Sequence, residues 1–120
     1  MPRVVLIAED DEATLSGLAA CLHQAGYSVI PVLSFAEAHR LMRFARPDVV
    51  VADVRLGKYN GLQLAVQAGS LDPPPAVIIT SGFEDSVITA EAKRLGAAFL
   101  LKPVDPARLL ALIAKLVNPW

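Results

Sequence analysis

Short apolar runs rich in β-branched residues alternate along this 120-residue chain with longer stretches of mixed polarity. Unbroken apolar runs of this length are typical of strands that are buried on both faces, as in a parallel sheet. We therefore predict five strands, at 3–8 (RVVLIA), 28–32 (SVIPV), 48–52 (DVVVA), 76–80 (AVIIT) and 97–101 (AAFLL).

The intervening stretches carry apolar residues at helical spacing. In the first of them the apolar residues at i, i+3, i+4 and i+7 are Leu15, Leu18, Ala19 and Leu22, and Gly26 follows the predicted helix as a C-cap. The segment from Ser34 to Glu37 (SFAE) has the form of a capping box and begins a second helix. The same spacing predicts a short third helix at 61–68, a fourth at 84–95 and a fifth that Asp105 caps.

Strict alternation of strands and helices predicts an α/β fold with an open, doubly wound sheet, because parallel strands need crossover helices and these crossovers are right-handed. In such sheets the working crevice lies beyond the carboxyl ends of the strands. Polar residues that end different strands are therefore expected to meet there, namely Glu9, Asp10, Asp53, Thr80, Ser81 and Lys102.

Composition supports one compact domain. Hydrophobic residues make up 54% of the chain, and a domain of this size buries roughly 65% of its unfolded surface. We expect a single domain over residues 1–120, with no output domain in this chain. The sequence leaves open whether the chain is a stand-alone protein or a segment of a longer regulator or hybrid kinase.

Charge and cysteine content narrow the class of protein. The formal net charge is −1 and the basic residues are scattered, so we expect no direct binding of nucleic acid. The single cysteine, Cys21, excludes an intramolecular disulfide and fits a reducing compartment. No apolar run approaches the ~20 residues of a membrane span, so we expect a soluble cytoplasmic protein without membrane association.

Four consecutive acids follow the first predicted strand in the segment VVLIAEDDEA, residues 4–13. Neighbouring carboxylates disfavour one another's ionised form, and a cation among them turns this repulsion into attraction. Mg²⁺ prefers such hard oxygen ligands and often binds a phosphoryl group with them. The pattern predicts a magnesium site that involves Glu9 and Asp10, whereas Asp11 and Glu12 are expected to cap the next helix.

Four segments together carry a family resemblance: VVLIAEDDEA, PDVVVADVRLGKYNGLQL, VIITSG and GAAFLLKPVDPARLL. In order and spacing they resemble the receiver domain of two-component response regulators over essentially the whole chain. The resemblance implies a flavodoxin-like (βα)5 sandwich whose parallel strands have the order 2-1-3-4-5. It also implies a signalling domain that catalyses only its own phosphorylation and dephosphorylation.

The resemblance assigns roles to individual residues. Asp53 is expected to accept a phosphoryl group from a sensor histidine kinase or a phosphotransfer protein. Lys102 is expected to pair with Asp53 or with the phosphoryl group and to precede a cis bond to Pro103. Thr80 is expected to hydrogen-bond the phosphoryl group, and Phe99 is expected to act as an aromatic switch. The expected Mg²⁺ ligands are Glu9, Asp10, Asp53 and the backbone carbonyl of Arg55.

The implied output surface comprises residues 84–116, which include the fourth helix, the fifth strand and the fifth helix. Phosphorylation is expected to reshape it and so to control a downstream protein or a fused domain. The fifth helix carries more apolar residues than one buried face needs, among them Leu110, Ala114, Val117 and the nearby Trp120. They indicate either a broad footprint on the sheet or a partner or homodimer surface.

The chain departs from the family pattern near the phosphoacceptor. Gly57 stands where the family usually has proline, and with residues 58–61 it is expected to loosen the loop. Phe99 lacks the hydroxyl of the tyrosine that is common at this position. Arg55 and Gly82 flank the site, and we expect the Arg55 side chain to slow loss of the phosphoryl group.

Other functions fit the sequence less well. A flavodoxin-like FMN carrier would need a phosphate loop rich in Ser, Thr and Gly after the first strand, where this chain has acids. A phosphatase of the haloacid dehalogenase group would need a second aspartate two residues after the nucleophile, whereas Asp10 is followed by Asp11 and Glu12. The main alternative is a phosphorylation-independent pseudo-receiver that acts as a protein-binding scaffold. His23 and His39 lie within helical patterns and are expected to be structural or solvated.

Overall fold

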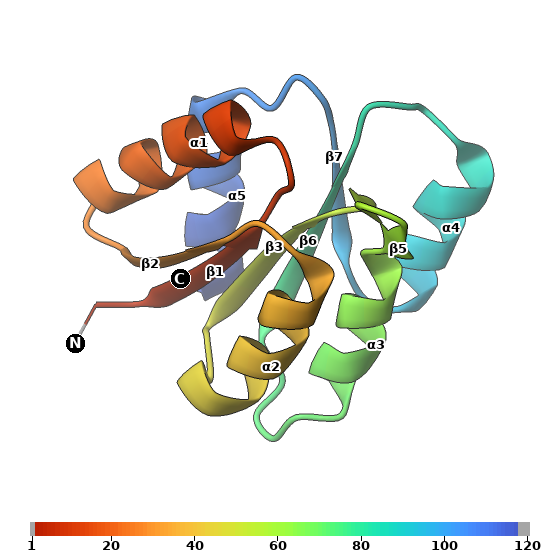
Figure 1. Cartoon of the computed structure of the whole chain (residues 1–120), viewed down its shortest axis with the longest axis horizontal. Coiled ribbons are helices and arrows are strands. Elements are labelled where there is room, and N and C mark those ends of the chain that lie inside the picture. Colours follow the sequence, from red (N-terminus) through yellow and green to blue (C-terminus); the bar gives the residue numbers. More distant parts are fainter. Residues whose placement is uncertain (1, 118–120) are drawn as a thin grey trace.

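A single five-stranded parallel sheet organises the computed structural model, which describes residues 2–117. Its strands, in the spatial order β2-β1-β3-β6-β7, are β2 (Ser28–Val32), β1 (Val4–Ala8), β3 (Val49–Asp53), β6 (Ala76–Ser81) and β7 (Ala98–Leu101) (Figure 1). Counted along the chain, these five strands have the predicted order 2-1-3-4-5, so the predicted fold is confirmed.

Helices cover both faces of the sheet (Figure 1). α1 (Glu12–Gln24) and α5 (Pro106–Val117) lie on one face. α2 (Phe35–Ala45), α3 (Leu62–Gly69) and α4 (Ser86–Arg94) lie on the other. α5 buries Leu109 and Ile113. Of the additional apolar residues, Leu110 and Val117 pack partly buried against the same cluster, Ala114 is exposed, and Trp120 lies outside the described residues.

Two hydrophobic clusters fill the spaces between the sheet and these helix layers. The central strands β1 and β3 contribute alternate residues to the two clusters, which explains why their sequences are unbroken apolar runs. The edge strand β2 is more exposed and tolerates Pro31, because an edge position leaves one side of the backbone unpaired.

Short polar residues begin the helices as their sequence predicts. The Asp11 side chain accepts a hydrogen bond from the Thr14 N–H at 3.0 Å, and Ser34 Oγ accepts one from the Glu37 N–H at 3.2 Å. Such caps contribute about 1 kcal/mol each. At the other end of α1, Gly26 has a φ of +99°, a left-handed conformation that glycine adopts without strain.

The loop after β3 differs from the expected loose segment. Two short strands, β4 (Arg55–Leu56) and β5 (Tyr59–Asn60), form an antiparallel ladder that the sequence did not predict. Gly57 turns this hairpin with a φ of +62°. Gly61 then passes so close to β3 that a Cβ atom there would lie 2.0 Å from the Asp53 carbonyl oxygen. The glycines therefore fit the loop against the end of β3.

Within residues 2–117, no helix combines the length and the apolar character needed to cross a membrane.

Candidate functional site at the carboxyl edge of the sheet

Three carboxylates meet where β1 and β3 end. Oxygens from Glu9, Asp10 and Asp53 all lie within 4.8 Å of one another. Glu9 is 4% exposed and Asp53 is 7% exposed, whereas Asp10 faces solvent. The convergence follows from topology, because β1 and β3 are adjacent parallel strands and their carboxyl ends share one edge.

Lys102 brings a positive charge to this cluster from the segment after β7. Its Nζ donates hydrogen bonds to Glu9 Oε2 and Asp53 Oδ2, each at 2.7 Å. The Lys102 backbone N–H donates to the Ser81 carbonyl at 2.7 Å, which fixes the segment against β6. The predicted cis bond between Lys102 and Pro103 is confirmed.

Burial and charge shift the proton affinities of this cluster. Burial raises the pKa of Glu9, and the nearby Asp53 charge adds to the rise, although Lys102 and the Asp11 N–H oppose it. Burial also disfavours the charged form of Lys102, but hydrogen bonds and charges from Asp53 and Glu9 outweigh it and raise the Lys102 pKa. Lys102 therefore stays cationic and neutralises only part of the negative charge around it.

Backbone N–H groups of the loop after β3 orient two of the carboxylates. The Arg55 N–H donates to Asp53 Oδ1 at 3.2 Å, and the Gly57 N–H donates to Asp10 Oδ2 at 3.0 Å. The second bond ties the β4–β5 hairpin to the end of β1. The carboxylates thus occupy fixed positions relative to one another.

The donor set fits a hard divalent cation. Carboxylate oxygens from Glu9, Asp10 and Asp53 are the ligands that Mg²⁺ prefers, and one lysine leaves the three acids incompletely neutralised. The cluster contains three of the four ligands that the sequence predicts for Mg²⁺. Arg55 lies next to this cluster, because its N–H donates to Asp53. Its backbone carbonyl stays a predicted ligand.

Thr80 and Phe99 lie on the strands beside the cluster. Thr80 is buried and stands opposite Asp53 in the β3–β6 register. Phe99 stands opposite Ile79 in the β6–β7 register and packs partly buried against the core. These positions do not test the roles predicted for Thr80 in phosphoryl binding and for Phe99 in switching, so both roles stay predictions.

An Arg55–Phe83 contact at the crevice was missed by the sequence analysis. The Arg55 guanidinium lies over the Phe83 ring, 5.1 Å from its centroid, a distance typical of a cation–π interaction. Ser81 Oγ accepts from the Phe83 N–H and donates to the Phe83 carbonyl, both at 3.1 Å, which holds the turn that carries the ring. No local pattern in GFED predicts this contact.

These residues enclose a crevice of about 340 Å³ next to the phosphoacceptor candidate. Its lining comprises Asp10, Asp53, Val54, Arg55, Gly57, Ser81, Gly82, Phe83 and Lys102. The crevice combines a buried carboxylate, a cation and backbone N–H groups, an arrangement suited to phosphoryl transfer by positioning and charge neutralisation.

The two histidines lie elsewhere. His23 is in the last turn of α1, and His39 is exposed on α2, where its ring lies 5.8 Å from that of Phe35. Neither belongs to the acidic cluster.

Comparison with known proteins gives a consistent picture. The family model described as "Response regulator receiver domain" matches residues 5–114. The receiver domain protein (CheY-like) from Methanospirillum hungatei JF-1 superposes with a TM-score of 0.88 at 25% identity, over 99% of this chain and 96% of that chain.

Two curated relatives are longer than this chain. The alginate biosynthesis transcriptional regulatory protein AlgB of Pseudomonas syringae pv. tomato is 34% identical over 92% of this chain, which spans 25% of AlgB. The transcriptional regulatory protein PdtaR of Mycobacterium tuberculosis is 32% identical over 98% of this chain, which spans 58% of PdtaR.

Proposed function

Because the chain belongs to the response regulator receiver domain family, we propose that it is a phosphoacceptor switch in a two-component phosphorelay, with Asp53 as the acceptor. Receiver domains are signalling modules rather than conventional enzymes, and they work with a cognate histidine kinase and a downstream output partner. The observation that carries the assignment of Asp53 is its carboxylate at the crevice, bonded by Lys102 and grouped with Glu9 and Asp10.

The proposed step is transfer of a phosphoryl group from a phosphohistidine to Asp53. A carboxylate oxygen of Asp53 forms a bond to phosphorus while the phosphorus–nitrogen bond of the donor breaks and its imidazole takes up a proton. Lys102 stabilises the negative charge on the transferring oxygens, and Thr80 donates a hydrogen bond to the phosphoryl group. The Arg55 N–H, which donates to Asp53 Oδ1, keeps the orientation of this carboxylate fixed.

Glu9, Asp10, Asp53 and the Arg55 carbonyl would hold Mg²⁺. When bound, the ion supplies charge neutralisation for the phosphoryl oxygens.

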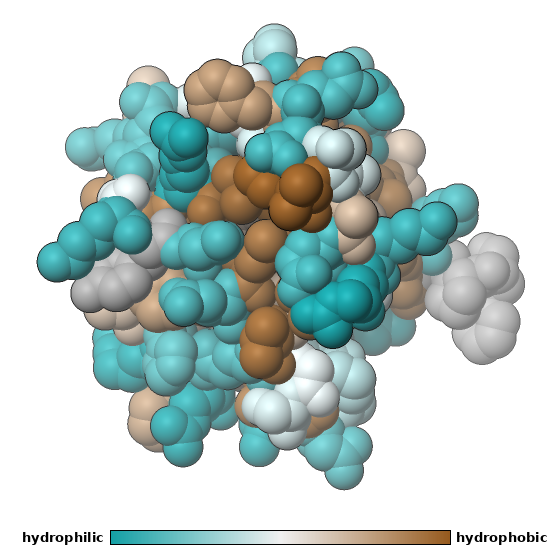
Figure 2. Space-filling model, turned by 90° about the vertical axis from the view of Figure 1, so that its right-hand side faces the viewer, coloured by the Kyte–Doolittle hydropathy of each residue, from teal (hydrophilic) through white to brown (hydrophobic). Residues whose placement is uncertain are grey.

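The proposed output passes through residues 84–116. The phosphoryl group of an aspartyl phosphate carries about −1.5 to −2 charge in place of the single carboxylate charge, and its oxygens would draw Thr80 toward them and let Phe99 repack. On the side of the molecule that carries α4, apolar side chains form a band between hydrophilic ones (Figure 2). Phe83 and Val87 are among the exposed large hydrophobic residues of this region. Such a surface suits a downstream protein, a fused domain or a second copy of the chain.

This proposal treats residues 1–120 as one cytoplasmic receiver domain. Two of its relatives are named as transcriptional regulatory proteins, which supports control of transcription as the output of the pathway. The output would then reside in a fused domain or in a separate partner.

The test is the intact mass of the protein after incubation with Mg²⁺ and acetyl phosphate. We expect one phosphoryl increment, and its loss in the Asp53→Ala variant and in a metal-free sample. Absence of the increment from every sample, together with absence of Mg²⁺ binding, would favour the phosphorylation-independent scaffold.

A further inference from the structure

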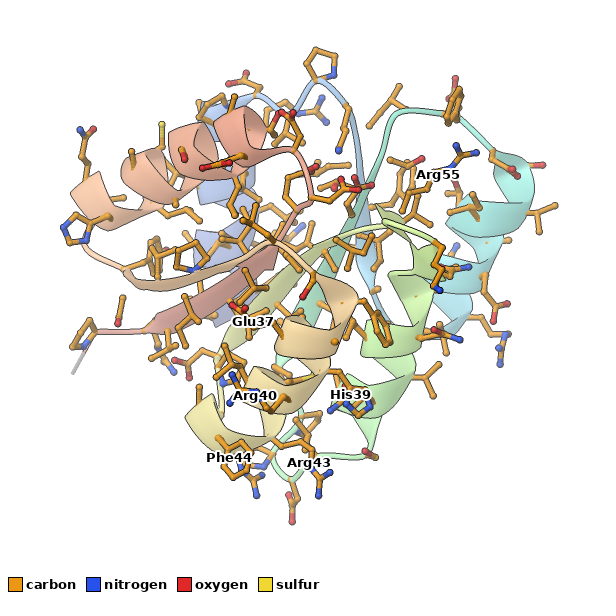
Figure 3. All side chains as sticks on the ribbon, in the orientation of Figure 1. Glu37, His39, Arg40, Arg43, Phe44 and Arg55 are labelled. Carbon is orange, nitrogen blue, oxygen red and sulfur yellow. The ribbon has the colours of Figure 1, made fainter. Side chains whose placement is uncertain are left out.

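We propose that the C-terminal half of α2 and the adjoining end of α3 form a docking surface for an acidic segment of a partner protein. Its charged and aromatic residues, named the α2 patch, are His39, Arg40, Arg43, Phe44 and Arg46, and α3 contributes Gln67. Figure 3 shows the labelled α2 residues near the lower end of the molecule, away from Arg55 at the crevice. The proposal goes beyond the phosphoacceptor function, because it concerns the opposite edge of the sheet.

Phe44 is the first indication of an interface. It is 78% exposed, although α2 already packs through the buried Ala38 and Met42. Phe35, on the first turn of the same helix, packs against the core. Phe44 therefore contributes little to the interior of this domain. Exposed aromatic residues beside arginine are typical of the centres of protein–protein interfaces.

The charges around Phe44 lack partners of their own. Among residues 2–117, neither Arg40 nor Arg43 makes an ion pair or a side-chain hydrogen bond, and both are exposed. Within the described part of the chain, Arg46 donates only to the Asp72 carbonyl oxygen, at 3.3 Å. A helix C-terminus favours cations, which accounts for basic residues at 43 and 46. This preference does not explain Arg40, which lies one helical turn before the exposed Phe44 and beside it on the helix surface.

A groove of about 520 Å³ lies between this part of α2 and the end of α3. Its lining contains no acidic side chain and consists of His39, Arg43, Phe44, Arg46, Gln67, Ser70 and Leu71. The only acid on α2 is Glu37, in the first turn of the helix. A negatively charged ligand therefore meets attraction from the arginines of the groove, and Asp72, which follows Leu71, is the acid next to its lining in the sequence.

Gln67 links the two helices that form the groove. Its Nε2 donates to the His39 carbonyl at 2.8 Å, which fixes the orientation of the amide. Its Oε1 is buried and accepts no hydrogen bond from the described residues. Because this atom is closed to a molecule on the surface, Gln67 shapes the groove and offers no acceptor to a ligand.

An acidic peptide segment matches both the charge and the apolar character of this surface. Its carboxylates pair with the arginines, and an apolar side chain covers Phe44. Nucleic acid is less suited, because the chain has a formal net charge of −1 and lacks the basic excess that attracts long phosphate backbones. Since the groove lies away from the crevice, docking is expected to be independent of phosphorylation.

The experiment selects ligands from a displayed library of random twelve-residue peptides on the immobilised full chain, with the Arg43→Glu variant used for counter-selection. We expect the selected peptides to combine Asp or Glu with an apolar residue. Fluorescence anisotropy with a labelled selected peptide then measures affinity. The Arg43→Glu and Phe44→Ala variants are each expected to weaken binding about tenfold or more, as at an interface hot spot.

Two controls keep the result specific. Arg108→Glu changes an exposed arginine on α5 by the same charge and is expected to leave peptide binding unchanged. Asp53→Ala is expected to bind the peptide normally, so that failure of the phosphoacceptor proposal and failure of this one are separable. Circular dichroism and thermal unfolding verify that each variant folds.

Three outcomes overturn the proposal. The first is a selection that enriches no peptide over the counter-selected background. The second is an enriched peptide that lacks acids or binds Arg43→Glu as tightly as the unchanged protein. The third is a labelled twelve-nucleotide single-stranded RNA that binds and is released by Arg43→Glu, which would assign the patch to nucleic acid instead.

Discussion

At the carboxyl edge of the sheet, the buried Glu9 and Asp53 both accept hydrogen bonds from the partly buried Lys102. At the other edge, Arg40 and Arg43 are exposed and unpaired among the described residues. Charges that are held by partners occupy fixed positions, which is what a chemical step needs. Charges left in solvent cost little to the folded domain and are available to a partner molecule. The difference separates a site for chemistry from a surface for recognition.

The largest effect on phosphorylation is expected from Lys102→Ala. The substitution leaves two buried carboxylates without their cation, and it should slow phosphorylation by acetyl phosphate about 100-fold. Without Mg²⁺ it should also lower the free energy of unfolding by about 2 kcal/mol, less than for a fully buried pair because the Lys102 side chain is 25% exposed. Mass-resolved kinetics and urea unfolding measure the two effects.

Mg²⁺ provides the control for this variant, because a bound cation should restore part of the lost stability. If, in the absence of Mg²⁺, Lys102→Ala has the same free energy of unfolding as the unchanged protein, Lys102 does not stabilise the buried carboxylates. The proposed difference between the two edges would then be wrong.

Gly61 and Gly69 lie at the two ends of α3, and the same substitution at each compares the packing at the two edges of the sheet. A Cβ atom at Gly61 would lie 2.0 Å from the Asp53 carbonyl, whereas one at Gly69 meets nothing within 4 Å. Gly61→Ala should therefore lower the free energy of unfolding by about 2–4 kcal/mol, because the backbone of the β3–α3 loop must shift. Gly69→Ala should change it by less than about 1 kcal/mol. Equal effects in urea unfolding would show that the crevice is not tightly built.

Arg55→Ala and Phe83→Ala should shorten the lifetime of the phosphorylated protein several-fold. Removing either partner of the 5.1 Å contact opens the crevice, so that water attacks phosphorus and breaks its bond to Asp53 more readily. The decay of the phosphorylated mass after removal of the donor measures this rate. An unchanged rate in Arg55→Ala rules out the shielding role.

The smallest effect is expected from Arg43→Ala. Since this side chain makes no ion pair or hydrogen bond among residues 2–117, the free energy of unfolding should change by less than about 0.5 kcal/mol. Urea unfolding beside Lys102→Ala makes the comparison direct. A loss near that of Lys102→Ala would mean that Arg43 serves the fold and not a partner.

Most of the fold follows from local sequence. Unbroken apolar runs indicate strands buried on both faces, and β1 and β3 are such strands. The acids after these strands could be assigned to one edge because parallel strands place their carboxyl ends together. The roles of individual residues, such as Thr80 and Phe99, came only from the resemblance to a known family. The positions of these residues do not by themselves test those roles.

The missed features depend on contacts between distant segments. The Arg55–Phe83 contact joins two loops, and the close approach of Gly61 to Asp53 depends on the path of the hairpin. The basic residues looked scattered along the sequence, yet α2 places Arg40 and Arg43 beside Phe44. Helical spacing could have grouped them, but only the structure shows that their side chains have no partner among residues 2–117 and that α3 completes a groove.

The central claim is that Asp53 accepts the phosphoryl group, and mapping the modified residue tests it most directly. The protein would be phosphorylated with Mg²⁺ and acetyl phosphate, reduced with borohydride to convert an aspartyl phosphate to homoserine, and sequenced by tandem mass spectrometry. We predict homoserine at position 53 and aspartate at position 10. Homoserine at another aspartate with residue 53 unchanged, or no homoserine anywhere, would contradict the assignment.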